Sequence, residues 1–219
     1  MKTYTLAIIG FGNVGQGLTK IISDKKQLLI EKFGIHLSIV AICDLYKGSL
    51  YNPKGLDPEV LLSDLEKHGD LKSTSAPITG WNATETIDKS GADILVELAF
   101  TDLQTGEPAV SHIKQALNNG MHVSMTNKGP VALHFPELRK IALSNNVQIG
   151  IEGTVMSGTP AINLGNEMLL AAGITKIQGI LNGTTNYILD EMSSGAGYEN
   201  ALKQAQELGY AEADPTGDV

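Results

Sequence analysis

A glycine-rich turn near the start of the chain constrains its fold more than any other feature. The turn Gly10-Phe11-Gly12-Asn13-Val14-Gly15 follows a short apolar run, Tyr4–Ile9. It opens a segment in which apolar side chains recur at helical spacing to about Glu31. A second β-rich stretch, Leu37–Cys43, comes next and ends at Asp44. Strand, glycine turn, helix and strand in this order predict a βαβ unit.

The three glycines of this turn match the G-x-G-x-x-G pattern of dinucleotide-binding proteins. Gly10 allows the tight turn, Gly12 lets the backbone approach a pyrophosphate, and Gly15 lets the helix pack closely on the strand. The N–H groups at the helix N-terminus can then bind the phosphates. Glycines also mark ordinary tight turns, but the βαβ context favours dinucleotide binding.

The sequence leaves the choice between NAD and NADP open. Asp44 closes the second strand, where an acid normally accepts hydrogen bonds from the ribose 2′-hydroxyl and favours NAD. It lies further from the glycines than the usual spacing of about 20 residues, because the intervening helix is long. Lys47 and Lys54 follow it, either as ordinary solvated lysines or as partners of the 2′-phosphate of NADP.

Strands and helices continue to alternate up to about residue 152. We expect a long irregular insertion over 46–55. This alternation predicts an α/β fold with a Rossmann-like, doubly wound parallel sheet. The further predicted strands are 93–99, 121–125 and 147–151, and the further predicted helices are 60–67 after the N-cap Asp57 and Pro58, a short one capped by Thr84, 107–118 and 136–144.

The composition shifts near Glu152, where Gly, Thr and Ser become dense. We therefore expect an NAD(P)-binding domain over 1–152 and the start of an α+β substrate or dimerisation domain over 153–219. The elements predicted in this second part are the helix Ala161–Ala171, the β-rich segment Ile174–Leu181, the turn Asn182–Asn186 and two more helices.

Composition and charge exclude several classes of protein. A hydrophobic content of 42% with 18% charged residues indicates a globular chain. The net charge of −8 argues against nucleic acid or an anionic membrane as a partner. The single cysteine, Cys43, excludes an internal disulfide and a cysteine-based zinc site and fits a reducing compartment. No apolar run approaches the length of about 20 residues that spans a bilayer, so we expect a cytoplasmic protein.

Three polar segments are candidates for chemistry. Asn127-Lys128-Gly129-Pro130 follows a predicted strand, so Lys128 is either a loop charge or a donor at the nicotinamide end of the ligand crevice. The segment Glu152–Pro160 offers a carboxylate and several backbone carbonyls, which suit a hard cation or simply a hinge. The end of the chain, 209–219, places Glu212, Asp214 and Asp218 close together and is interpreted as a substrate-binding loop.

Together these segments resemble homoserine dehydrogenase, and the resemblance runs from end to end of the chain. The Asn-Gly-Thr-Thr-Asn turn and the Gly-Tyr-x-Glu-x-Asp-Pro segment are specific to that family, whereas the glycine pattern is not. The segments that carry the resemblance are Gly10–Gly15, Asn127–Pro130, Glu152–Val155, Gly179–Asn186 and Gly209–Asp218.

The resemblance implies reversible hydride transfer between NAD(P)H and L-aspartate 4-semialdehyde, which gives L-homoserine, and a homodimer joined through the second domain. It implies that Lys128 approaches both cofactor and substrate, and it adds Phe11, Asn13 and Val14 to the cofactor turn. The other residues that it implies are Gly209 and Glu212 for substrate, Asp218 as an acid near the substrate, and Glu152, Val155, Ser157 and Thr159 for a monovalent cation such as Na⁺. Lys128, Glu212 and Asp218 are the candidate catalytic residues.

One part of the family pattern has no counterpart in these residues. The family continues with a Gly-x-Asp-x-x-x-Lys stretch that carries the main proton-donating lysine. We therefore expect the N-terminal two-thirds of such an enzyme, able to bind the cofactor with little or no turnover. The alternatives are a non-catalytic dinucleotide-binding or dimerisation module, and a phosphorylating semialdehyde dehydrogenase. The latter needs an activated cysteine nucleophile, and Cys43 is on the wrong strand to provide it.

Overall fold

The chain divides into two compact units, and the boundary along the chain lies between Ile151 and Glu152. The computed structural model describes residues 1–156 and 158–211. The first unit contains a seven-stranded sheet covered by helices, and the described part of the second unit is helical. No helix in the described part of the chain is long and apolar enough to cross a membrane.

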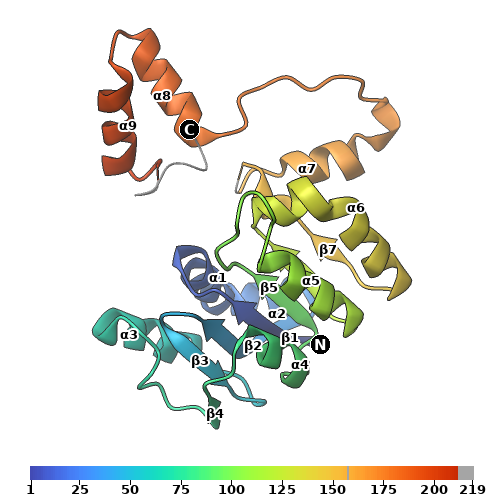
Figure 1. Cartoon of the computed structure of the whole chain (residues 1–219). Coiled ribbons are helices and arrows are strands. Elements are labelled where there is room, and N and C mark those ends of the chain that lie inside the picture. The colour runs from blue at the N-terminus through green and yellow to red at the C-terminus, as the bar shows by residue number, and fades with distance from the viewer. Residues whose placement is uncertain (157, 212–219) are drawn as a thin grey trace. The chain divides into compact units, whose positions relative to one another are not determined.

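The sheet of the first unit has the strand order β4-β3-β2-β1-β5-β6-β7 (Figure 1). Strands β2, β1, β5, β6 and β7 run parallel, whereas β3 and β4 are antiparallel to their neighbours at one edge. The strands are β1 (Lys2–Ile9), β2 (Ile35–Asp44), β3 (Gly48–Tyr51), β4 (Ile78–Thr79), β5 (Ile94–Glu97), β6 (His122–Met125) and β7 (Ile149–Gly150). The helices are α1 (Asn13–Asp24), α2 (Lys26–Phe33), α3 (Pro58–His68), α4 (Ala83–Lys89), α5 (Ala109–Asn118) and α6 (Lys128–Ser144).

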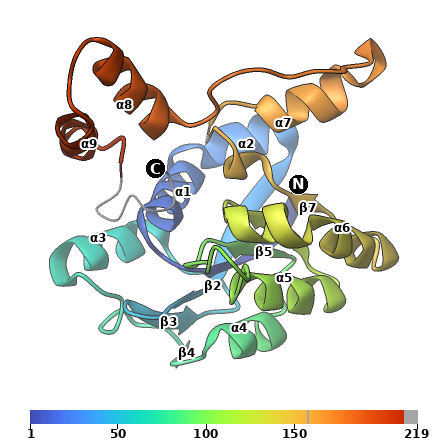
Figure 2. The same cartoon turned by 45° about the horizontal axis from the view of Figure 1, so that its top comes forward.

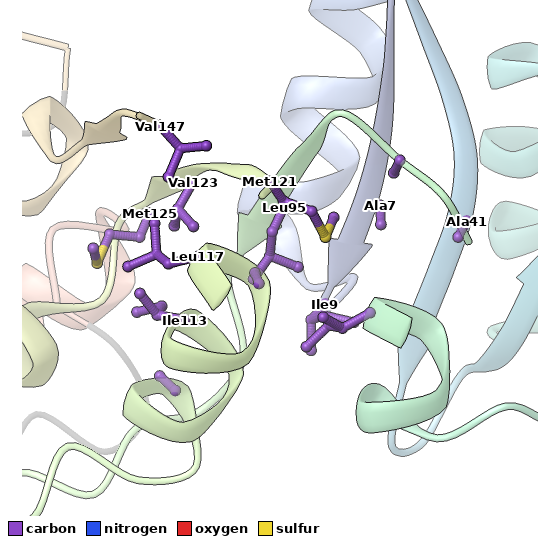
Figure 3. Close-up of a cluster of buried hydrophobic side chains, with 14 of the residues drawn as sticks. Ala7, Ile9, Ala41, Leu95, Ile113, Leu117, Met121, Val123, Met125 and Val147 are labelled. Carbon is purple, nitrogen blue, oxygen red and sulfur yellow. The ribbon is translucent and has the colours of Figure 1, made fainter. Parts of the chain in front are cut away.

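Helices cover both faces of this sheet (Figure 2). Alternate residues of β1 point to opposite faces of the sheet, as the two-residue period of a strand requires, and so pack in different clusters. Leu6 and Ile8 pack in a cluster that includes α1 and α3, whereas Ala7 and Ile9 pack in a cluster that includes α4, α5 and α6. Figure 3 shows part of the second cluster, formed by side chains of β1, β5, β6 and α5. The predicted Rossmann-like, doubly wound α/β fold is confirmed.

The prediction of an irregular insertion over 46–55 was wrong, because this stretch contains β3. The Asp44 carboxylate accepts hydrogen bonds from the backbone N–H groups of Tyr46 and Lys47, both at 2.9 Å, which tightens the turn after β2. Gly48 then has φ +96°, a conformation that suits glycine. The chain doubles back and pairs antiparallel with β2.

Several helix boundaries also differ from the predictions. The helix expected from Val14 to Glu31 is two helices that meet at Lys25. Helix α4 is capped by Asn82 in a reciprocal capping box with Glu85, and not by Thr84. The predicted N-cap Asp57 of α3, followed by Pro58, is confirmed.

Helix α6 begins eight residues before its predicted start at Pro136. Proline is common in the first turn of a helix, and a helix start at Pro136 is consistent with this preference. The structure instead places Pro136 inside α6, which runs from Lys128. Leu138 and Ala142 anchor the helix in the core, so packing outweighs the missing proline N–H.

In the second unit, the β-rich segment Ile174–Leu181 forms no strand, so that prediction was wrong. No partner strand lies beside it in residues 152–156 and 158–211, and a strand needs a ladder to satisfy its backbone. The predicted turn Asn182–Asn186 is the start of a helix, because Asn182 Oδ1 accepts from the N–H of Thr185 at 2.8 Å. The helical segments here are η1 (Glu152–Thr154), α7 (Ala161–Asn163), η2 (Leu164–Met168), η3 (Leu170–Ala172), α8 (Gly183–Ser193) and α9 (Tyr198–Glu207).

Candidate functional site

The glycine-rich turn lies at the carboxyl end of β1, where the strand order reverses between β1 and β5. Ligands of open α/β sheets bind outside such a switch point. Gly10 has φ +87°, and a Cβ there would lie 2.5 Å from the Leu98 carbonyl oxygen. A Cβ on Gly15 would lie 2.9 Å from the Gly10 carbonyl oxygen. Both glycines are therefore required by close backbone packing, as the sequence predicts.

Gly12 differs from the other two glycines, because a Cβ there would meet no atom within 4 Å. It is the N-cap of α1 and, having no side chain, makes no capping hydrogen bond. Gly12, Asn13 and Val14 are all exposed. An exposed helix N-terminus with its partial positive charge suits a phosphate group, so this turn fits the pyrophosphate of a dinucleotide.

Phe11 contributes to the turn only through its backbone. Its side chain is fully buried in the core between the sheet and α1. Its N–H donates to Asp44 Oδ2 at 2.7 Å, and its carbonyl accepts from Gln16 Nε2 at 3.2 Å. A cofactor in this turn would meet the Phe11 backbone and not its ring.

Asp44 links the glycine-rich turn to the turn after β2. Its carboxylate accepts three backbone N–H groups, those of Phe11, Tyr46 and Lys47. Burial raises the pKa of this carboxyl, but the three N–H donors and the Lys47 charge lower it by more, so its pKa lies below its ordinary value. Asp44 is therefore ionised at neutral pH, and its contact with a ribose stays a prediction.

Lys128 lies at the carboxyl ends of the parallel strands, as the glycine-rich turn does. It is the exposed first residue of α6, and β6 runs parallel to β5, which runs parallel to β1. Ile9, Glu97 and Met125 are level with one another across these three strands. The segments that follow them carry the glycines and Lys128, so the two motifs lie at the same end of the parallel strands, and the donor role of Lys128 stays a prediction.

A buried polar cluster at this end of the parallel strands was not predicted from the sequence. Glu97 is 0% exposed and lies 2.9 Å from His112 on α5, measured from Oε2 to Nδ1. Its Oε1 accepts from the N–H of Ala99 at 2.9 Å and from Nδ2 of Asn127 at 3.3 Å. The available signal was an acid at the end of an apolar strand, because a carboxylate is buried only with partners.

In the second unit, the Glu152 carboxylate caps the first turn of α7. Oε1 accepts from the N–H of Ile162 at 3.0 Å, and Oε2 from that of Asn163 at 2.8 Å. Val155 and Thr159 lie between η1 and α7, and Ser157 lies outside the described residues. No group of three or more His, Cys, Asp or Glu that could hold a metal occurs among the described residues. The cation site, which relies on backbone oxygens, stays a prediction.

Gly209 follows α9 with φ +77°, and the next residue closes the α8–α9 hairpin. The Tyr210 carbonyl accepts a hydrogen bond from the Thr184 hydroxyl, and its ring lies 5.1 Å from that of Tyr187 between centroids. Glu212 and Asp218, predicted for substrate and catalysis, lie outside the described residues. The substrate role of Gly209 stays a prediction.

The fold and the glycine-rich turn define a Rossmann-type dinucleotide-binding protein. Residues 10–152 match the family described as homoserine dehydrogenase, NAD binding domain, and residues 160–219 match the family described as homoserine dehydrogenase. The chain therefore belongs to the homoserine dehydrogenase family, as its sequence predicts.

Relatives and solved structures agree with this family. The chain is 44% identical to an NAD(+)-dependent homoserine dehydrogenase of Pseudomonas canavaninivorans over 100% of this chain and 62% of that protein. It is 40% identical to a homoserine dehydrogenase of Methanocaldococcus jannaschii over 98% of this chain and 63% of that protein. A hyperthermophilic archaeal homoserine dehydrogenase in complex with NADPH superimposes with a TM-score of 0.85 at 30% identity, over 100% of this chain and 65% of that one. The chain thus spans under two thirds of the length of these relatives.

Proposed function

We propose that the protein to which this chain belongs is an NAD(P)-dependent homoserine dehydrogenase, which interconverts L-homoserine and L-aspartate 4-semialdehyde. The observation that carries this proposal is the placement of the glycine-rich turn after β1 and of Lys128 after β6, at the carboxyl ends of two parallel strands that flank β5, in a chain whose two parts both match the family. The match of the second part argues against a dinucleotide-binding module without a substrate domain.

In this proposal the nicotinamide of NAD(P) accepts or supplies the hydride when it is bound. The exposed N-terminus of α1 holds the phosphates, and the open space in front of Gly12 admits them. The ionised Asp44 carboxylate beside the turn accepts ribose hydroxyls and disfavours a 2′-phosphate, which supports NAD over NADP.

The reacting oxygen of the substrate needs a donor, because reduction of an aldehyde places negative charge on that oxygen. The Lys128 ammonium is an exposed cation at the ligand edge of the sheet and donates to this oxygen. Glu212 accepts hydrogen bonds from the ammonium group of the amino-acid substrate, together with backbone groups at Gly209. Asp218 lies beside the substrate, and a Na⁺ ion binds Glu152 with backbone oxygens of Val155, Ser157 and Thr159.

The second unit also serves as the dimerisation domain of a homodimer in this proposal. Large apolar side chains are exposed there, among them Met168 at 77%, Leu170 at 76% and Ile177 at 72%. Exposed apolar surface of this kind favours association. The single buried cysteine suits a reducing compartment, so we propose a cytoplasmic location.

The direct test is turnover by the protein as it occurs in the cell. L-homoserine should drive reduction of NAD⁺, and less effectively of NADP⁺, followed by the absorbance of the reduced nicotinamide. Lys128→Ala should lower kcat by about 100-fold or more, the usual effect of removing one donor to a developing oxyanion.

Lys140→Ala is the matched control, because Lys140 is an exposed lysine further along the same helix. It should turn over as the wild type does. Absence of homoserine-dependent reduction with both cofactors would contradict the proposed activity. Wild-type rates in Lys128→Ala would remove Lys128 from the active site and leave the activity itself standing.

A further inference from the structure

A buried carboxylate lies between the glycine-rich turn and the segment that carries Lys128. Glu97 ends β5 and is 0% exposed. In the sheet it is level with Ile9 on one side and with Met125 on the other. Ile9 precedes the glycine-rich turn, and Met125 precedes the segment that leads into α6. Glu97 is thus the central residue of the three strand ends.

Both oxygens of Glu97 are engaged, and we call Glu97, Ala99, His112 and Asn127 the Glu97 network. Oε1 accepts from the Ala99 N–H at 2.9 Å and from Asn127 Nδ2 at 3.3 Å. Oε2 lies 2.9 Å from Nδ1 of His112, which is itself only 9% exposed. The folded protein is strongly destabilised when a buried carboxylate loses its partners, so these hydrogen bonds stay formed in the native fold.

The network reaches the glycine-rich turn through Ala99. The Glu97 carboxylate holds the Ala99 N–H, which fixes the backbone of the segment just after β5. That segment is the one against which Gly10 packs: a Cβ on Gly10 would lie 2.5 Å from the Leu98 carbonyl oxygen and 2.7 Å from the Ala99 nitrogen. Glu97 therefore fixes the surface on which the turn rests.

The network reaches Lys128 through Asn127. Asn127 is the N-cap of α6, and an asparagine there usually accepts a hydrogen bond from the first helical turn. In this helix it makes no such capping bond, and its amide donates to Glu97 instead. The start of α6 is thus tied to the end of β5, and not to the helix's own cap.

We propose that Glu97 is a positioning residue, which sets the placement of Lys128 through its hydrogen bond to Asn127 and supports the cofactor turn through Ala99. Glu97 does not touch the substrate, because it is fully buried behind these groups. The proposal rests on the proposed role of Lys128 as a donor to the reacting oxygen.

The first test compares two substitutions of Glu97 in the natural protein. Glu97→Leu keeps the size and removes every acceptor, whereas Glu97→Gln keeps an oxygen for Ala99 and Asn127 and offers its amide to His112. We expect Glu97→Leu to lower kcat by about 100-fold, as misplacement of a catalytic group by about 1 Å does. Glu97→Gln should restore most of that loss, with KM for homoserine little changed.

Glu137→Gln is the matched control, because Glu137 lies on α6 but is exposed and pairs with Lys114 at 2.8 Å. It should leave kcat unchanged. Wild-type kcat in Glu97→Leu would overturn the proposal.

The second test combines each change with Lys128→Ala. If Glu97 acts through Lys128, Glu97→Leu slows the Lys128→Ala enzyme far less than it slows the wild type. Equal slowing in both backgrounds would show that Glu97 does not set the placement of Lys128 and would overturn the proposal. Asn127→Ala, which breaks only one bond of the network, serves in the same cycle if Glu97→Leu does not fold.

The third test needs no turnover, so it separates this inference from the proposed function. Amide hydrogen exchange over 126–132 should be faster in Glu97→Leu or Asn127→Ala than in the wild type, and exchange over 138–144 should be unchanged. Unchanged exchange over 126–132 would overturn the proposal even in a protein that does not oxidise homoserine. An inactive wild type with the expected exchange pattern would contradict only the proposed function.

Discussion

At the scale of single residues, similar side chains in the first unit have different tasks that depend on their surroundings. Gly10 and Gly15 are needed because neighbouring backbone leaves no room for a Cβ, whereas Gly12 faces open space. Asp44 and Glu97 both end strands of the sheet, but Asp44 joins two turns and Glu97 is sealed inside the network that holds Asn127. Local geometry, and not residue type, decides which of these residues face open space and which support the neighbouring backbone.

Asp44 should stabilise the fold in a pH-dependent way. Asp44→Asn replaces the acceptor of the Phe11 N–H or of the Tyr46 and Lys47 N–H groups by an amide donor, so we expect a loss of about 1 kcal/mol near neutral pH. The native pKa of Asp44 lies below its ordinary value of 3.8. The stabilisation is therefore complete above that value and is lost as the pH falls through the native pKa.

Urea unfolding of both proteins at neutral pH and near pH 3 would measure this difference. Asp24→Asn is the control, because Asp24 is an exposed member of an ion pair with Lys20 on α1. It should change the free energy of unfolding little at either pH. A difference for Asp44→Asn that grows in acid would contradict the account.

At the scale of secondary-structure elements, local signals predicted the type of most elements better than their ends. The βαβ unit, the N-cap Asp57 and the parallel strands of the sheet were predictable, because each follows from a period or a cap in the sequence. The antiparallel strand β3 was not predictable, because the turn before it depends on hydrogen bonds that the Asp44 carboxylate accepts only in the folded chain. The segment 174–181 shows the reverse error, because β propensity gives no strand without a partner.

The cap of α4 allows a direct comparison of a sequence prediction with the structure. Asn82→Ala removes the side chain that accepts from the Glu85 N–H at 2.9 Å, and we expect a loss of about 1 kcal/mol in the free energy of unfolding. Thr84→Ala, at the residue that the sequence favoured, should change it by less than about 0.5 kcal/mol. Thermal and urea unfolding of the two variants would measure this, and the opposite ranking would contradict the capping box.

The functional site was predictable only in part, for the same physical reason. Gly10, Gly12, Gly15 and Lys128 belong to local motifs that follow strands, so their shared edge of the sheet followed from the fold. The Glu97 network joins residues of β5, α5 and the start of α6, and only the packed structure brings these elements together. An acid at the end of an apolar strand is a signal for a buried carboxylate, but it does not show which distant residues bind that carboxylate.

At the scale of the whole molecule, the chain combines a dinucleotide-binding unit with a helical unit that exposes many apolar side chains. It spans 62% of its Pseudomonas canavaninivorans relative. Binding of a cofactor by these residues can therefore be measured separately from the complete reaction. The residues to which we assign cofactor binding, the glycine-rich turn, Asp44 and Lys128, all lie in the first unit.

Titration of the 219-residue chain with NADH, followed by nicotinamide fluorescence, tests the central claim that the glycine-rich turn binds a dinucleotide. We expect saturable binding by the wild type. We also expect at least about tenfold weaker binding by Gly12→Val, because the added side chain fills the open space that a pyrophosphate needs. Gly12→Val should still fold, with a loss of about 1 kcal/mol or less at the N-cap. No binding of NADH or NADPH by the wild type, or equally tight binding by a folded Gly12→Val, would contradict it.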